Sequence, residues 1–159
     1  FTDLQLTVSR LTAKLEDHAR DGRVVGLVTH SFGDWIARSA IANAGQHSVG
    51  RLISLAPVVT SVPVARRLHR LTKNRVPEIR VMADRDAASA FRDLPTTVEQ
   101  VVLWAAWEKL VVRPDDWTNS TARHETVTGT HVSIIFQPRV WRRVAQHLRI
   151  RESSGWPDG

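Results

Sequence analysis

The chain has 159 residues, of which 42% are hydrophobic and 24% are charged, a composition typical of one globular domain and not of a disordered or fibrous protein. Cysteine is absent, which excludes a disulfide scaffold, a thiol nucleophile and a cysteine-ligated metal. It also fits a reducing compartment, so we expect a cytoplasmic protein. The net charge is +6, but no nucleic-acid-binding motif accompanies the basic residues, and no apolar run is long enough to cross a bilayer. We therefore expect neither a nucleic-acid partner nor a membrane span.

The first elements are an amphipathic helix, a buried strand and a second helix. Apolar side chains recur at helical spacing over residues 3–20, and Asp21-Gly22 ends that pattern. Residues 24–29 form a continuous apolar run of strand length, typical of a strand that is buried on both faces. Residues 35–44 are expected to form the helix that follows.

The remaining pattern alternates strands and helices. Strands are predicted at residues 51–56, 78–83 and 123–128, and helices at residues 63–73 and 138–149. Residues 98–112 stay open between a buried helix and a strand centred on 101–103. This alternation predicts an α/β fold, with a mainly parallel sheet flanked by helices. We expect one domain over residues 1–150, followed by a polar tail at 151–159.

Ser31 stands where the first strand meets the second helix, as the nucleophile of a nucleophile elbow does. Strand and helix backbones nearly touch around such a turn, which calls for small residues two positions before and after the serine. Gly33 meets this requirement, whereas Thr29 stands where glycine is usual. The N–H of Phe32 would serve as an oxyanion donor at the helix N-terminus. A serine that merely caps the helix is the plainer alternative.

A candidate base lies roughly one hundred residues downstream. His131 follows the last predicted strand within Gly129-Thr130-His131, and Pro138 opens the closing helix behind it. This matches the chain order of serine, acid and histidine in hydrolases with such an elbow. An ordinary surface histidine is the alternative reading.

The His30-Ser31-Phe32-Gly33 turn, the Gly129-Thr130-His131-Val132-Ser133-Ile134-Ile135 segment and Pro138 together resemble the α/β-hydrolase superfamily. They are similar in particular to thioesterase domains that release acyl chains from carrier proteins, and esterases share much of the pattern. The resemblance implies a serine hydrolase that cleaves an acyl ester or thioester, carrier-protein-bound substrates included. It implies neither an organic cofactor nor a metal.

The resemblance also indicates where the acid should be. In most relatives it follows the second strand after the elbow strand, which here is the strand predicted at 78–83. Asp86 is therefore the expected acid, with Asp84 as the alternative, so that the triad would be Ser31, Asp86 and His131. Either aspartate could instead stabilise a turn through its side chain.

Complete relatives carry several strands ahead of the elbow, whereas the segment before Ser31 has room for one helix and one strand. We therefore expect the C-terminal portion of a hydrolase domain that lacks the first strands, or a minimal relative. The open sheet edge could pair two copies into a homodimer. Two other functions stay open: an acyltransferase of the same fold, and a non-catalytic hydrolase-like binding domain.

Overall fold

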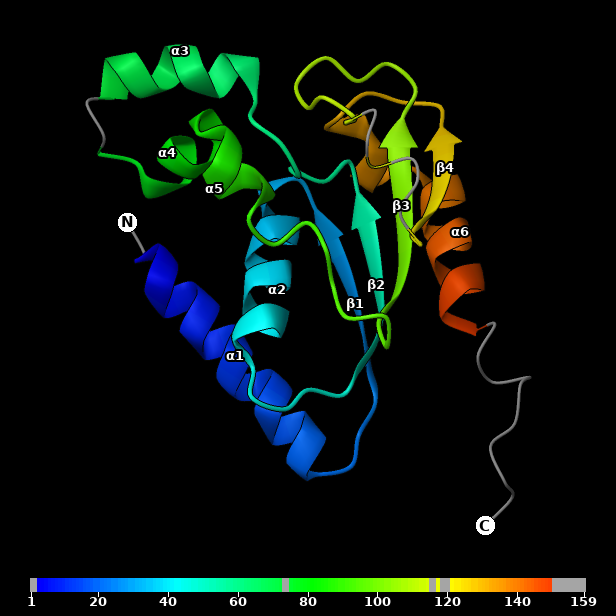
Figure 1. Ribbon diagram of the computed structural model, residues 1–159. Coiled ribbons are helices and arrows are strands. Elements are labelled where there is room, and N and C mark those ends of the chain that lie inside the picture. The colour runs from blue at the N-terminus through cyan, green and yellow to red at the C-terminus, as the bar shows by residue number, and fades with distance from the viewer. Residues whose placement is uncertain (1–2, 73–74, 115–116, 118–120, 150–159) are drawn as a thin grey trace.

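The computed structural model (Figure 1) describes residues 3–72, 75–114, 117 and 121–149. Its sheet has four parallel strands, which lie side by side in chain order. They are β1 (Val25–His30), β2 (Val49–Leu55), β3 (Glu99–Ala105) and β4 (Arg123–Val127). This arrangement confirms the α/β class with a parallel sheet flanked by helices.

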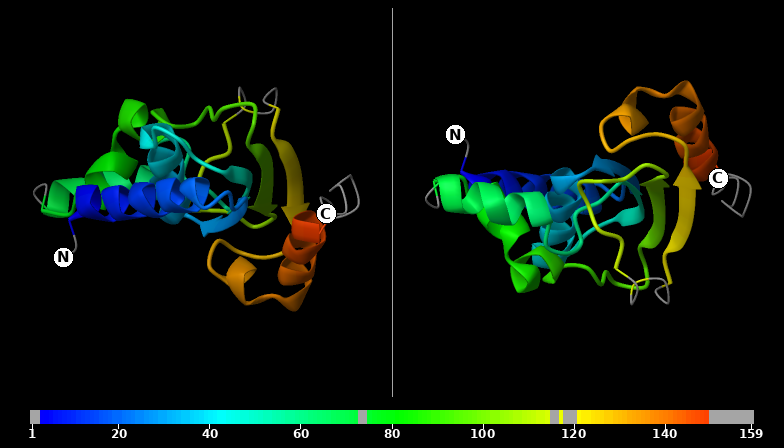
Figure 2. Two further views of the ribbon diagram at one scale, coloured as in Figure 1. Left: turned by 90° about the horizontal axis from the view of Figure 1, so that it is seen from below. Right: turned by 90° about the horizontal axis from the view of Figure 1, so that it is seen from above.

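Helices cover both faces of the sheet. In chain order they are α1 (Leu4–Arg20), α2 (Phe32–Asn43), α3 (Pro63–Thr72), α4 (Pro77–Ala83), α5 (Arg85–Ser89), the 3-10 turn η2 (Ser133–Phe136) and α6 (Pro138–Arg149). Helices α1 and α2 lie on one face and α6 lies on the other, while α3, α4 and α5 gather beyond the carboxyl ends of β1 and β2 (Figures 1 and 2).

The core occupies both faces of the two central strands. Every residue of β2 is buried, as are all residues of β3 after Glu99. On one face Leu52 packs with α1 and α2, and on the other Ile53 and Val101 pack against Val140 of α6. Burial on both faces explains why these strands read as continuous apolar runs rather than as alternating patterns.

The predicted strand over residues 78–83 is wrong, because this segment is helix α4. Pro77 occupies the first turn, where its fixed φ suits a helix and its missing N–H costs nothing. Glu78 also lies in the first turn, next to the partial positive charge of the helix N-terminus. The third strand is instead β3, within the stretch 98–112 that the sequence left open between helix and strand.

Strand β1 forms an edge of the described sheet, with β2 as its partner there. The homodimer expected through this edge stays a prediction. The polar tail expected at 151–159 lies outside the described residues. Among the helices that the structure describes, none is both long and apolar enough to span a membrane.

Candidate active site

Ser31 forms the turn between β1 and α2. Its backbone lies in the left-handed region, with φ 54° and ψ −129°, which is unfavourable for any residue with a side chain. Neighbouring backbone groups hold it there: Ser31 N–H donates to Leu55 O at 3.0 Å, and Ser31 O accepts from Asp34 N at 3.1 Å and Val58 N at 3.3 Å. The strained turn that the elbow motif predicts is therefore present, and three hydrogen bonds stabilise it.

Thr29, which replaces the usual glycine, has a buried partner in α2. Its hydroxyl donates to Asp34 Oδ1 at 2.7 Å, and Ser54 Oγ donates to the same oxygen at 2.5 Å. Asp34 has no exposed surface. Threonine is thus tolerated at this position because its hydroxyl group forms a hydrogen bond with the buried carboxylate of Asp34.

Arg38 neutralises that carboxylate and extends the network across the sheet. Its Nε donates to Asp34 Oδ2 at 2.5 Å, and its Nη1 donates to Gln100 Oε1 at 3.0 Å and Arg92 O at 2.8 Å. Its guanidinium lies 5.2 Å from the centre of the Trp117 ring. A charge buried this deeply is tolerated only when it is paired and hydrogen-bonded, as it is here.

His131 is carried by a tight turn after β4. Gly129 has φ 149°, a backbone conformation that residues with a side chain rarely adopt, so glycine is favoured there. Trp107 N–H donates to Gly129 O at 3.0 Å, and Ile134 N–H donates to Thr130 O at 3.1 Å. The first bond ties the histidine turn to the loop that follows β3, and the second closes the turn itself.

The imidazole of His131 bridges a hydroxyl and a carboxylate. Its Nε2 lies 2.8 Å from Ser31 Oγ, and its Nδ1 lies 2.9 Å from Glu108 Oε2. An ionised carboxylate only accepts hydrogen bonds, so Nδ1 carries the proton and Nε2 is free to accept from the serine. This is the orientation that a general base for Ser31 requires.

Glu108 is held ionised by its surroundings. Burial raises the pKa of its carboxyl group, but hydrogen bonds to Oε1 from the backbone of Leu110 (2.8 Å) and Val111 (3.1 Å), together with His131, outweigh burial and lower the pKa overall. The two backbone donors also fix the direction of the carboxylate.

The imidazole of His30 forms a hydrogen bond with the backbone of His131. His30 Nε2–H donates to the carbonyl oxygen of His131 at 2.9 Å, and the two ring centres are 4.9 Å apart. Burial is the main cause that lowers the pKa of His30; the hydrogen bond to His131 raises it in part. His30 thus favours its neutral form beside His131.

Phe32 is the first residue of α2, so its N–H has no acceptor within the helix. This donor adjoins Ser31 at the positive end of α2, a position where a negatively charged oxygen would be stabilised. The described residues contain no group of three or more His, Cys, Asp or Glu side chains that could hold a metal ion.

The structure brings Ser31 and His131 together but does not bring Asp86 to them. Asp86 lies exposed in the first turn of α5, and Asp84 caps that helix by accepting from Ala87 N at 2.9 Å. The carboxylate on His131 is Glu108, three residues after β3 ends. Assigning residues 99–105 as the third strand would have indicated Glu108, because the acid is expected after that strand.

Comparison with solved structures identifies the fold. The chain is similar to human thioesterase 2 (TM-score 0.60, 13% identity, 95% of this chain and 83% of that one). It is also similar to an esterase from Pyrobaculum calidifontis (TM-score 0.60, 14% identity, 94% and 60%) and to the α/β hydrolase MGS-MChE2 from a lagoon-sediment metagenome (TM-score 0.57, 16% identity, 91% and 70%). The protein therefore has an α/β-hydrolase-like fold. No protein-family model matches the sequence, and neither does any curated protein.

Proposed function

We propose that the protein is a serine hydrolase that cleaves an acyl ester or thioester with Ser31, His131 and Glu108 as its triad. The observation that carries the proposal is the chain of two short contacts, 2.8 Å from Ser31 Oγ to His131 Nε2 and 2.9 Å from His131 Nδ1 to Glu108 Oε2. These three side chains come from three separate loops, so their alignment does not follow from local helix capping.

In the proposed reaction, Ser31 Oγ attacks the acyl carbon while its proton passes to His131 Nε2. The negative oxygen of the tetrahedral intermediate receives the N–H of Phe32. His131 then gives the proton to the leaving alcohol or thiol as the carbon–heteroatom bond breaks, and water repeats the sequence to release the acid and regenerate Ser31. Glu108 keeps the proton of the resting imidazole on Nδ1 and stabilises the imidazolium.

Labelling with a small fluorophosphonate tests the nucleophile directly. We expect stoichiometric labelling of the wild-type chain on Ser31 and none in the Ser31→Ala variant. Ser61→Ala is the matched control, since Ser61 is a buried serine outside the triad that accepts a hydrogen bond from Arg66 at 2.7 Å. It should label like the wild type. Labelling that survives in Ser31→Ala, or that never occurs in the wild type, would refute the proposal.

A further inference from the structure

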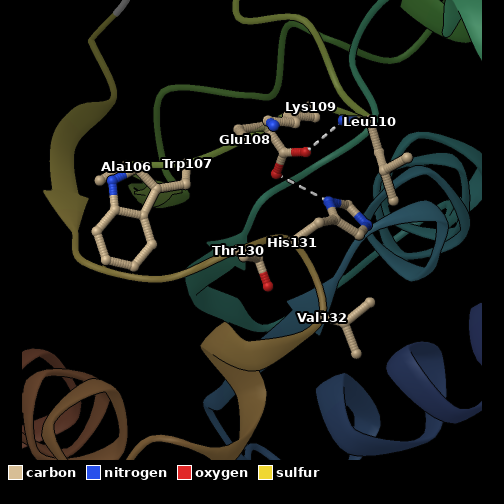
Figure 3. A pocket seen from close by; sticks show the side chains of 8 residues that line it. All are labelled: Ala106, Trp107, Glu108, Lys109, Leu110, Thr130, His131 and Val132. Atoms are coloured by element: carbon tan, nitrogen blue, oxygen red, sulfur yellow. Dashed lines mark hydrogen bonds and ion pairs between the residues drawn. The ribbon is translucent and has the colours of Figure 1, made fainter.

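A cavity of about 690 Å³ opens beside His131, between the loop after β3 and the histidine turn (Figure 3). This volume is within the range of about 300–1,000 Å³ typical of small-molecule sites. Glu108 and His131 form part of its wall, so it adjoins the proposed catalytic groups.

The lining is mainly apolar. Trp107 is 62% exposed, Val132 56% and Leu110 40%, and in Figure 3 these three side chains surround the Glu108–His131 pair. Large apolar side chains that gather around one cavity and stay exposed indicate a binding surface. The Glu108 carboxylate stays charged, but both of its oxygens already accept hydrogen bonds, and Lys109 adds the opposite charge to the lining.

The position of the cavity relative to the scissile bond indicates which part of the substrate it would bind. The acyl carbonyl oxygen must face the N–H of Phe32, whereas the leaving-group atom must face His131, which returns the proton to it. His131 lines the cavity, while Ser31 and Phe32 are absent from its lining. The cavity is therefore on the leaving-group side of the scissile bond.

We propose that this cavity binds the leaving group of the substrate, and that this group is an apolar alkyl or aryl alcohol or thiol. The inference rests on the proposed hydrolase function and adds a specificity to it. Of the three large apolar side chains that line the cavity, Trp107 is the largest and the most exposed, and its backbone N–H bond to Gly129 O does not depend on its side chain.

A pair of isomeric esters separates the two sides of the scissile bond. Hexyl acetate extends the leaving group of ethyl acetate, whereas ethyl hexanoate extends the acyl chain by the same number of methylenes. A fully buried methylene is worth about fourfold in binding. For a cavity this open we expect kcat/KM for hexyl acetate to exceed that for ethyl acetate by roughly tenfold in the wild type.

Trp107→Ala should remove most of this hexyl-to-ethyl ratio and leave the ratio of ethyl hexanoate to ethyl acetate unchanged. Trp141→Ala is the matched control, because Trp141 is an exposed tryptophan on α6 that does not line the cavity. It should keep both ratios. If Trp107→Ala lowers the ethyl hexanoate ratio instead, or neither ratio, the cavity does not bind the leaving group.

Fluorophosphonate labelling distinguishes this failure from that of the proposed function. Wild-type chain that labels on Ser31 and hydrolyses ethyl acetate without favouring hexyl acetate would overturn the leaving-group site alone. Chain that neither labels nor hydrolyses any of the three esters would overturn both proposals.

Discussion

The two sides of the Ser31–His131 contact are held in different ways. Behind Ser31, buried charged and polar side chains from α2 and the sheet form one network around Asp34 and Arg38. Around His131, backbone hydrogen bonds between two loops and the Glu108 carboxylate hold the ring next to an open cavity. Substitutions behind the serine should therefore lower stability, whereas substitutions beside the histidine should lower turnover.

Glu108→Gln gives the largest effect expected on the histidine side. The amide no longer fixes the proton on His131 Nδ1, and loss of that function in a triad costs about four orders of magnitude in turnover. The free energy of unfolding should fall only modestly: the amide loses the stability that the ionised carboxylate contributes at neutral pH, but its oxygen can still accept from Leu110 and Val111. Ester hydrolysis and urea denaturation of the same preparation measure the two effects.

Asp86→Asn is the control for that variant, since Asp86 is exposed in α5. It should keep wild-type turnover and stability. If Asp86→Asn loses as much turnover as is expected for Glu108→Gln, then Asp86 is the acid of the triad and Glu108 is not.

Asp34→Ala gives the largest effect expected behind the serine. It leaves the buried Arg38 guanidinium without its carboxylate, and breaking a buried pair in this way costs about 3–5 kcal/mol of stability. Asp84→Ala removes only the hydrogen bond that caps α5 and should cost about 1 kcal/mol. Equal losses in the two variants, measured by denaturant unfolding, would contradict the distinction between the two regions.

Thr29→Val tests one hydrogen bond of the buried network behind Ser31, the bond from Thr29 to Asp34. Valine keeps the shape of threonine but cannot donate to Asp34 Oδ1. A hydrogen bond to a charged acceptor contributes about 1.5–3 kcal/mol, and here Ser54 remains as a second donor. We expect a loss near the lower end of that range. Thr29→Ser keeps the hydroxyl and should recover most of the stability; an unchanged unfolding curve for Thr29→Val would contradict the role of this bond.

The strained turn at Ser31 and the turn that carries His131 could be predicted because their signals are local. An apolar run of strand length, Ser31 with Gly33 two positions after it, and a helix start follow one another within a few positions, and Gly129 and Pro138 bracket His131 in the same way. The fold class followed from the alternation of elements, which tolerates errors in any one of them.

The carboxylate that contacts His131 could not be predicted, because its position depends on which apolar run is the third strand. Periodicity does not separate a strand buried on both faces from a buried helix, and both 78–83 and 98–112 fit either pattern. Pro77 and Glu78 were helix-start signals that could have decided between them. The partnership of Thr29 with Asp34 was beyond sequence reasoning for another reason: the carboxylate reaches back across the elbow to meet Ser54 of a different strand.

The smallest effect expected concerns His30, which lies at the border of the two regions. Burial lowers its pKa from the ordinary value of 6.5, so the unfolded chain binds a proton at a pH where the folded chain does not. The free energy of unfolding therefore falls as the pH drops from about 7 through 6.5 toward the lower folded pKa. His124, whose pKa burial also lowers, contributes in the same direction, whereas the lowered pKa of Glu108 affects stability only below its ordinary value of 4.5.

His30→Gln keeps an Nε2–H donor for the His131 carbonyl without a titrating group, so its unfolding free energy should depend less steeply on pH between 7 and 5. If His30→Gln shows the wild-type slope, the neutral state of His30 is not coupled to folding.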